Sequence, residues 1–349
     1  MTGQDKIRIA VIGASGYTGA DLIRLAAGHP HIEISALAAN THAGEEMGRV
    51  FPHLQTLGLP DLVKSDDVAW GEIDAAFCGL PHGTAQDIIA GLPDKVKIID
   101  MSADFRLRDP DVYKSWYGRD HDATALLKTA IYGLTEHYTE EISKARLTAC
   151  PGCYPTAALL GLIPLVKGNM IAADDIIIDA KSGVSGAGRG LKQNTLFSEA
   201  GEGLSPYAIG THRHAPEIEQ ELSLAAGQDI VVNFTPHLIP MSRGELVTCY
   251  VRLANSISPA DLREQLRNAY KDKMFVNIVP DGVVPATQHV RGSNYCLIGV
   301  FEDRIPGRAI VISTLDNLVK GSAGQALQNF NLMFGFDEQV GLTQPPLFP

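Results

Sequence analysis

Short apolar runs alternate with helical patterns through the first half of the chain. The first run is continuous, as is typical of a strand buried on both faces of a sheet. The strand-like runs are Ile7–Ile12, Ile32–Ala39, Asp74–Leu80, Lys97–Met101 and Arg146–Cys150. Helical patterns lie over Ala20–Ala27 and around Thr84–Gly91. Strands separated by helices predict an α/β fold with a Rossmann-type, doubly wound parallel sheet.

The second half has a different pattern. Its strand-like segments are Asp175–Lys181, Ile230–Pro236, Glu245–Leu253, Tyr295–Glu302 and Arg308–Thr314. The last two flank the turn Asp303–Gly307 and predict an antiparallel pair. We expect helices over Pro259–Tyr270, with Ser258 as N-cap, and over Asp316–Phe334. This pattern predicts a second, α+β domain with a mixed or antiparallel sheet and helices on one face.

Composition and charge exclude several function classes. The chain has 349 residues, which suits about two domains. With 45% hydrophobic and 20% charged residues, it is not a disordered chain. Its net charge of -11 argues against nucleic acid as a partner, because the phosphate backbone is also negative.

Hydropathy and cysteine usage indicate the cellular compartment. No apolar run reaches about 18 residues, so we expect no membrane span. The polar start, Met1–Lys6, does not resemble a signal peptide. The five cysteines are odd in number and lie mostly in apolar segments, which does not fit a disulfide framework. We therefore expect a cytoplasmic protein.

A glycine-rich loop follows the first strand and opens the first helix, with the spacing G-x-x-G-x-x-G. Glycines let the backbone approach a pyrophosphate, and a helix start offers free N–H groups. A tight turn without a ligand is the alternative. The residues expected to bind a dinucleotide are Gly13, Ser15, Gly16, Tyr17, Thr18 and Gly19.

The end of the second predicted strand indicates which dinucleotide. NAD sites usually carry an acidic residue there, which bonds the ribose 2′-hydroxyl. The segment Leu37–His42 contains no carboxylate. Because an acid there would repel a 2′-phosphate, its absence favours NADP(H).

Cys153 has the sequence context of a nucleophile. It follows a predicted strand and precedes Pro155 and the apolar helical run Ala157–Val166. Proline suits the first turn of a helix, so Cys153 lies at a helix N-terminus, where the dipole lowers a thiol pKa. Cys150 and Cys153 also form a C-x-x-C, typical of a redox dithiol or half a metal site. No second C-x-x-C exists, and we expect no metal.

These residues converge on a known family. Matching segments run in order along nearly all of the chain: Gly13–Gly19, Ser102–Leu107, Pro151–Thr156, Ser182–Arg189, His212–Glu217 and Asp316–Gly321. On these motifs the chain resembles the N-acetyl-γ-glutamyl-phosphate reductases of arginine biosynthesis, in their longer form. One departure is Cys150, where the family usually has Asn.

The resemblance implies a reaction and a division of labour. Residues 1–153, rejoined by a C-terminal helix within 316–349, would form the NADP-binding Rossmann domain. Residues 154–315 would form the catalytic, substrate and oligomerisation domain. N-acetyl-glutamyl 5-phosphate would be reduced by NADPH to N-acetyl-glutamate 5-semialdehyde and phosphate through a thioester on Cys153. The resemblance also suggests a homotetramer or homodimer.

The remaining roles are assigned largely by resemblance. His212 and His214 are two apart and would point the same way in an extended segment. Either suits acid/base work, and Glu217 would orient a histidine or bind substrate. Metal ligation is the alternative for the histidine pair, but no third ligand is apparent.

Arginines and a second glycine-rich loop complete the expected site. Guanidinium groups match phosphate and carboxylate, so we expect Arg106, and more weakly Arg108 and Arg213, to bind substrate. The loop that begins at Ser182 could form a nest of backbone N–H groups for an anion. The further expected contacts are Ser182 to substrate, and Ser102, Ser185, Gly186, Gly188 and Asn317 to the cofactor.

Other functions remain open at this point. Within the same chemistry, the alternative is an aspartate-semialdehyde dehydrogenase or another acyl-phosphate reductase. A non-catalytic dinucleotide sensor would keep the glycine loop without needing a thiolate. Dithiol exchange would require Cys150.

Overall fold

The computed structural model describes residues 6–349, which divide into two compact units. The first unit contains the described residues up to Pro151 together with Ser322–Thr343. The second contains Gly152–Gly321 and Gln344–Pro349. The chain therefore passes between the units after Pro151, after Gly321 and after Thr343.

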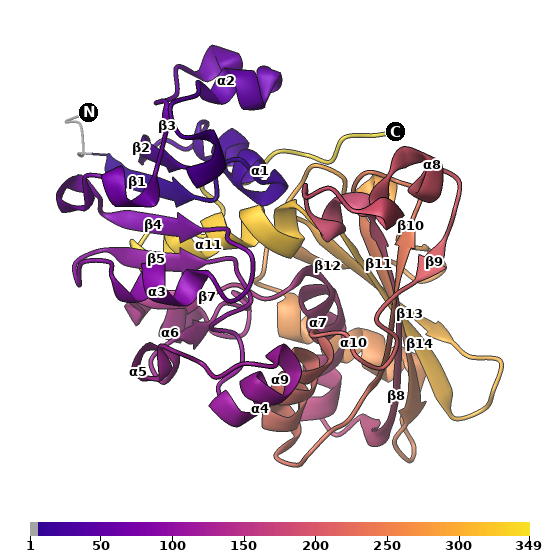
Figure 1. The fold of residues 1–349 in the computed structure, drawn as a ribbon. Helices are drawn as coiled ribbons and strands as arrows, with labels where there is room; N and C mark the ends of the chain where they lie inside the picture. Colours follow the sequence, from indigo (N-terminus) through magenta and orange to yellow (C-terminus); the bar gives the residue numbers. More distant parts are fainter. Residues whose placement is uncertain (1–5) are drawn as a thin grey trace. The chain divides into compact units, whose positions relative to one another are not determined.

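A seven-stranded sheet forms the centre of the first unit (Figure 1). All its pairings are parallel, in the order β3-β2-β1-β4-β5-β7-β6. The strands are β1 Ile7–Ile12, β2 Ile32–Ala38, β3 Leu62–Val63, β4 Ala75–Cys78, β5 Lys97–Asp100, β6 Ile131–Tyr132 and β7 Leu147–Ala149. The predicted parallel sheet is confirmed. The strand order reverses between β1 and β4, and open α/β sheets bind ligands at the carboxyl ends of strands at such a point.

Helices cover both faces of this sheet. Successive strand residues point to opposite sides, so both faces carry apolar side chains that pack against helices. Cys78 and Ile98 belong to a buried cluster with Ile89 of α3 (Ala85–Ala90). Phe77 points the other way, and its ring centroid lies 5.6 Å from that of Phe330 on α11 (Gly324–Met333). The other helices of this unit are α1 Tyr17–Ala26, α2 Met47–Val50, α4 Pro110–Tyr117, α5 Thr124–Leu127 and α6 Thr139–Lys144.

The second unit contains a mixed seven-stranded sheet in the order β12-β13-β14-β11-β8-β10-β9. Its strands are β8 Ile171–Gly183, β9 Ser205–Pro206, β10 Asn233–Ile239, β11 Glu245–Leu253, β12 Val276–Ile278, β13 Cys296–Glu302 and β14 Arg308–Leu315. The expected antiparallel pair is β13 with β14, whereas β10 runs parallel to β8. The predicted mixed sheet is thus confirmed.

The helix α7 (Cys153–Lys167) is the centre of the second unit's core. Every residue from Tyr154 to Val166 is buried, as expected for a helix that is apolar on all sides. A side chain added at Gly161 would meet Ser313 and Val311, so α7 packs on that face of β14. The other helices here are α8 Phe197–Ala200, α9 Ala215–Ala226 and α10 Pro259–Tyr270, the last with a capping box at Ser258.

The C-terminal segment differs from the prediction of one helix from residue 316. A π-helical turn over Val319–Ala323 comes first, and α11 begins only at Gly324. The carboxylate of Asp316 accepts bonds from the N–H groups of Leu318 and Val319, as a side chain does ahead of a helix. The expected helix Asp316–Phe334 is therefore confirmed in place, but it starts at Val319, opens with a π-helical turn and ends at Met333 within the segment 316–349. Across residues 6–349, no helix has the length and apolar character needed to cross a membrane.

Candidate active site

Cys153 is the first residue of α7. Its N-cap, Gly152, has no side chain to bond the free N–H groups of the first turn, and these groups with the helix dipole favour a thiolate. Cys153 is partly exposed, whereas Cys78, Cys150, Cys249 and Cys296 are buried. The structure therefore distinguishes Cys153 from the core cysteines.

Cys150 has a different environment. Its sulfur lies 3.6 Å from Nδ2 of Asn329 inside the first unit, and its exposure is 1%. Burial raises the pKa of the Cys150 thiol to about 12. Because exchange needs an accessible thiolate, these properties disfavour the dithiol alternative.

Both histidines lie immediately before α9. They occupy a turn, not the extended segment that we expected, but their ring centroids are only 4.6 Å apart. His214 is the N-cap of α9, and a Cβ added to Gly152 would lie 2.3 Å from its Nε2. The His214 ring therefore packs against the residue that precedes Cys153.

His212 is held as a neutral imidazole. Burial, with the Arg213 charge, lowers its pKa to about 4. The backbone N–H of His214 donates to Nδ1 of His212 over 3.1 Å, which leaves the proton on Nε2. His212 is thus a hydrogen-bond donor at neutral pH.

Glu217 joins α9 to the start of α7. Its Oε1 accepts a bond of 2.8 Å from the N–H of Gly152, and its side chain is buried. The helix α9 was not predicted, although Pro216 and Glu217 in its first turn are a helix-start signal.

Three further residues around Cys153 were not among those expected from the sequence: Tyr154, Tyr207 and Glu245. The Tyr207 and Tyr154 hydroxyls are 3.3 Å apart, and the Tyr154 hydroxyl donates to the carbonyl of His237. Burial raises the pKa of both tyrosines. Glu245, at the start of β11, is fully buried and interacts with the Cys153 thiol. Its only sequence signal was a single acid at the start of the predicted strand Glu245–Leu253.

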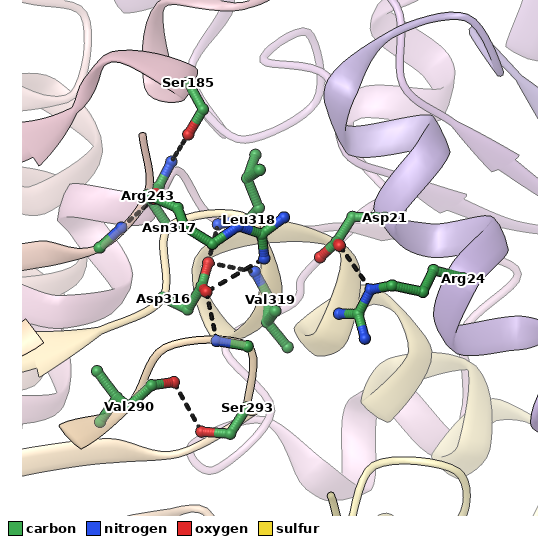
Figure 2. A network of polar contacts seen from close by, with 12 residues as sticks. Asp21, Arg24, Ser185, Arg243, Val290, Ser293, Asp316, Asn317, Leu318 and Val319 are labelled. Atoms are coloured by element: carbon green, nitrogen blue, oxygen red, sulfur yellow. Dashed lines mark hydrogen bonds and ion pairs between the residues drawn. The ribbon is translucent and has the colours of Figure 1, made fainter. Parts of the chain in front are cut away.

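A polar network supports the glycine-rich loop after β8 (Figure 2). Asn317 donates to Oγ of Ser185 over 2.9 Å and accepts from the N–H of Gly244 over 2.8 Å. Its neighbour, the buried Asp316, pairs with Arg243 over 3.2 Å. Asn317 thus bridges two loops with its side chain.

The same loop does not form the expected anion nest with its leading N–H groups. Those of Gly183, Val184 and Ser185 donate to carbonyls of residues 241–244, and that of Gly188 donates to the Ser185 carbonyl. The close approach of Gly186 to Ser182, whose Oγ would lie 2.8 Å from an added Cβ, brings these two together.

The glycine loop of the first unit is tightly packed against neighbouring backbone. Gly13 has a φ of +85°, and an added Cβ would lie 2.4 Å from the Gly79 carbonyl oxygen. A Cβ on Gly19 would lie 2.5 Å from the Gly13 oxygen, so α1 packs closely on the loop. Gly16 is the N-cap of α1 and carries no capping side chain. Ser15, Tyr17 and Thr18 lie on this loop and helix start, with Tyr17 exposed.

The expected anion-binding residues of this unit differ in burial. Arg106 is buried and donates to the Met101 carbonyl over 3.1 Å, whereas Arg108 is exposed beside the Tyr138 ring. Ser102 donates from its N–H and its hydroxyl to Asp100. Burial raises the pKa of Asp100 to about 7.

The structure thus gathers the predicted residues in two groups. The second unit holds Cys153, His212, Arg213, His214, Glu217, Ser182, Ser185, Gly186, Gly188 and Asn317. The first holds the glycine loop with Ser102, Arg106 and Arg108. Within residues 6–349, no three His, Cys, Asp or Glu side chains are arranged to hold a metal ion.

Comparison with known proteins follows the same division. Residues 8–145 match the semialdehyde dehydrogenase NAD binding domain, and residues 153–317 match the semialdehyde dehydrogenase dimerisation domain. A probable N-acetyl-gamma-glutamyl-phosphate reductase of Arabidopsis thaliana, described as chloroplastic, is 55% identical over 98% of this chain and 86% of its own. The N-acetyl-gamma-glutamyl-phosphate reductase of Rhodospirillum rubrum is 54% identical over 99% of both. The chain belongs to the N-acetyl-gamma-glutamyl-phosphate reductase family.

Solved structures share its fold. Aspartate semialdehyde dehydrogenase II of Vibrio cholerae, complexed with ASA, has a TM-score of 0.70 at 15% identity over 95% of this chain and 99% of its own. The Candida albicans aspartate semialdehyde dehydrogenase with NADP has a TM-score of 0.68 at 17% identity, over 96% and 100%. The much higher identity to the reductases does not favour the aspartate-semialdehyde alternative.

Proposed function

We propose that this chain reduces N-acetyl-L-glutamyl 5-phosphate to N-acetyl-L-glutamate 5-semialdehyde and phosphate, with NADPH as reductant, in arginine biosynthesis. The observation that carries the proposal is the partly exposed Cys153 at the N-terminus of α7, with the His214 ring against its N-cap. A dinucleotide sensor would have no use for this arrangement. The reductase family supplies the substrate.

The chemistry begins at the sulfur of Cys153. Its thiolate attacks the carbonyl carbon of the acyl phosphate, the C–O bond to phosphate breaks, and phosphate leaves with the bonding electrons. The product is a thioester on Cys153. NADPH, when bound, supplies hydride to the thioester carbon. The thiohemiacetal then collapses, so that the C–S bond breaks and the thiolate returns with the aldehyde.

Two histidines serve this cycle differently. His214 is the candidate acid/base, which donates and removes the proton at the thiohemiacetal oxygen, because its ring packs against Gly152, the residue before Cys153. His212, neutral and with its proton on Nε2, suits hydrogen bonding to substrate. Glu217 acts through the Gly152 N–H and positions the start of α7.

We assign recognition of the substrate phosphate and carboxylate to arginine side chains and to Ser182. Arg106 follows β5 at the carboxyl edge of the parallel sheet, where ligands of such folds bind. Arg213, next to the histidines, is a second candidate for an anionic group. Arg108 is the weakest, because it is exposed and lies over Tyr138.

The cofactor is NADP(H). The loop Gly13–Gly19 fits a pyrophosphate, since side chains at its first and last glycines would collide with backbone atoms. The turn Asn40–His42 after β2 has no carboxylate to repel a 2′-phosphate. Ser102, Ser185 and Asn317 are proposed as further cofactor contacts, with Gly186 and Gly188 in the same loop as Ser185.

The partner is a second copy of this chain, in a homodimer or homotetramer. In the second unit, α7 and α10 pack on one face of the sheet. On the opposite face, Leu246, Tyr250 and Ile312 remain only half-buried in the single chain, an apolar surface that suits an interface. The five described cysteines are free, which fits a reducing cytoplasm.

The test is phosphate-dependent NADP reduction with N-acetyl-glutamate semialdehyde, run beside aspartate semialdehyde. Activity that requires the acetylated substrate, phosphate and Cys153 supports the proposal. Activity with aspartate semialdehyde but not with the acetylated aldehyde would show that the proposed substrate is wrong. Activity retained by Cys153→Ala would refute the thioester route.

A further inference from the structure

Glu245 is a buried acid without a counter-ion beside the nucleophile. Its side chain is 0% exposed at the start of β11. Apart from the Cys153 thiol, neither carboxyl oxygen has a hydrogen-bond partner in residues 6–349. The nearby Arg243 is paired with Asp316.

Strand register explains why Glu245 reaches Cys153. Glu245 lies opposite Ser182 of β8 and Leu315 of β14. Its face of β11 is the one that includes Val247 and Cys249, which are buried on the α7 side of the sheet. The carboxyl therefore lies on the α7 side of the sheet, and its interaction with Cys153 places it at the first residue of α7.

Fold stability does not account for this residue. A buried carboxyl without an ion pair costs free energy, and its replacement by an apolar side chain is often neutral or stabilising. A role at the sulfur explains why an acid stands on the face of β11 that otherwise carries the apolar residues Val247, Cys249 and Val251.

We propose that Glu245 is a positioning residue that, as the neutral acid, donates its carboxyl O–H to the sulfur of Cys153. The donated bond holds the sulfur in place and stabilises the thiolate before attack on the acyl phosphate. The inference rests on Cys153 being the nucleophile of the proposed function.

The protonation state of Glu245 follows from its surroundings. Burial, with the Asp316 charge, raises its pKa to about 8, and a hydrogen bond from the Cys153 thiol to the ionised carboxyl opposes part of this rise. Once Cys153 is a thiolate, the same contact favours the neutral acid as donor. The titratable groups that interact with it are Cys153 and Tyr154 from α7, Tyr207 after β9 and Asp316 after β14. At neutral pH it is a donor, and above about pH 8 it becomes a negative charge that disfavours the thiolate.

Alkylation of Cys153 by iodoacetamide between pH 6 and 10, followed by mass spectrometry of its peptide, tests the proposal without substrate. Glu245→Gln keeps a neutral donor, so its rate at pH 7 should stay within about 3-fold of the native rate. In the native chain, ionisation of Glu245 above about pH 8 should slow the rise of the alkylation rate with pH. Glu245→Gln cannot ionise, so its alkylation rate should keep rising through this pH range. Glu245→Leu removes the donor and should react about 10-fold more slowly at pH 7.

Controls separate this role from a structural one. Glu219→Gln neutralises a carboxyl of α9 whose pKa burial also raises, and it should leave the alkylation profile unchanged. Glu245→Leu should unfold at no lower urea concentration than the native chain, so slower alkylation would not reflect misfolding.

The proposal is overturned if Glu245→Gln keeps the native pH profile, or if Glu245→Leu alkylates at the native rate. Because the assay needs no substrate, its result is independent of which aldehyde the enzyme accepts. Failure of the proposed function would instead show as full activity in Cys153→Ala.

Discussion

Replacement of Gly152 by Ala tests the site most directly. The added Cβ would lie 2.3 Å from Nε2 of His214, whereas ordinary contacts start at 3.4 Å, so the ring must retreat by about 1 Å. Gly152 has φ -64° and ψ 159°, which alanine adopts freely, so the change brings no backbone strain. The effect falls on the position of His214.

The expected magnitude follows from that displacement. A misplacement of about 1 Å at a reacting group can cost about 10²-fold in rate, within the range of about 10²–10⁴-fold that a general acid/base supplies. We expect kcat to fall about 10²-fold. Crowding itself should lower the free energy of unfolding by only about 1–3 kcal/mol.

Steady-state kinetics and urea unfolding are the assays, in a cycle with His214→Ala. If Gly152→Ala acts through His214, it should cost little further activity once His214 is absent. Gly161→Ala is the matched control. Gly161 lies in the same helix, α7, but its added Cβ would crowd Ser313 and Val311 of β14, away from the site. Equal losses with and without His214, or a kcat within about 3-fold of native, would refute the reasoning.

Three further predictions concern single side chains. Cys153→Ala should abolish the phosphate-dependent reaction, while Cys150→Ala should keep at least about a third of the activity; loss of activity in Cys150→Ala would revive the dithiol alternative. Arg106→Gln should raise KM for phosphate about 10-fold or more, and Arg108→Gln should change it less than about 3-fold; equal effects would contradict the assignment. Folding raises the pKa of Asp100 from 3.8 to about 7, so between these values the folded chain holds a proton that the unfolded chain has lost. Its contribution to the free energy of unfolding therefore falls as pH rises from about 4 to 7, and urea unfolding of Asp100→Asn should lack this decline; an unchanged pH dependence would show that Asp100 is ionised in the fold.

Local pattern was sufficient for the framework of this protein. Apolar runs such as Ile7–Ile12 were recognisable as strands, because a strand that is buried on both faces of a parallel sheet needs apolar residues at nearly every position. Gly13 and Gly19 marked a loop where backbones approach, and Pro155 after Cys153 marked a helix start. These signals depend on neighbours in the chain, so they can be interpreted without the tertiary structure.

The tertiary structure decided what depends on distant residues. The roles of the two histidines separate only because α9 packs at the start of α7, which places His214 against Gly152 and partly buries His212, so that its ring is neutral. Asn317 lies at the start of the expected C-terminal helix, yet its side chain bridges loops around residues 185 and 244. Glu245 carried almost no local signal, because its contact with Cys153 arises from strand register and the docking of α7 on the sheet. Helix and strand signals are local in sequence, whereas burial and proton affinity are set by the packing of segments far apart in the chain.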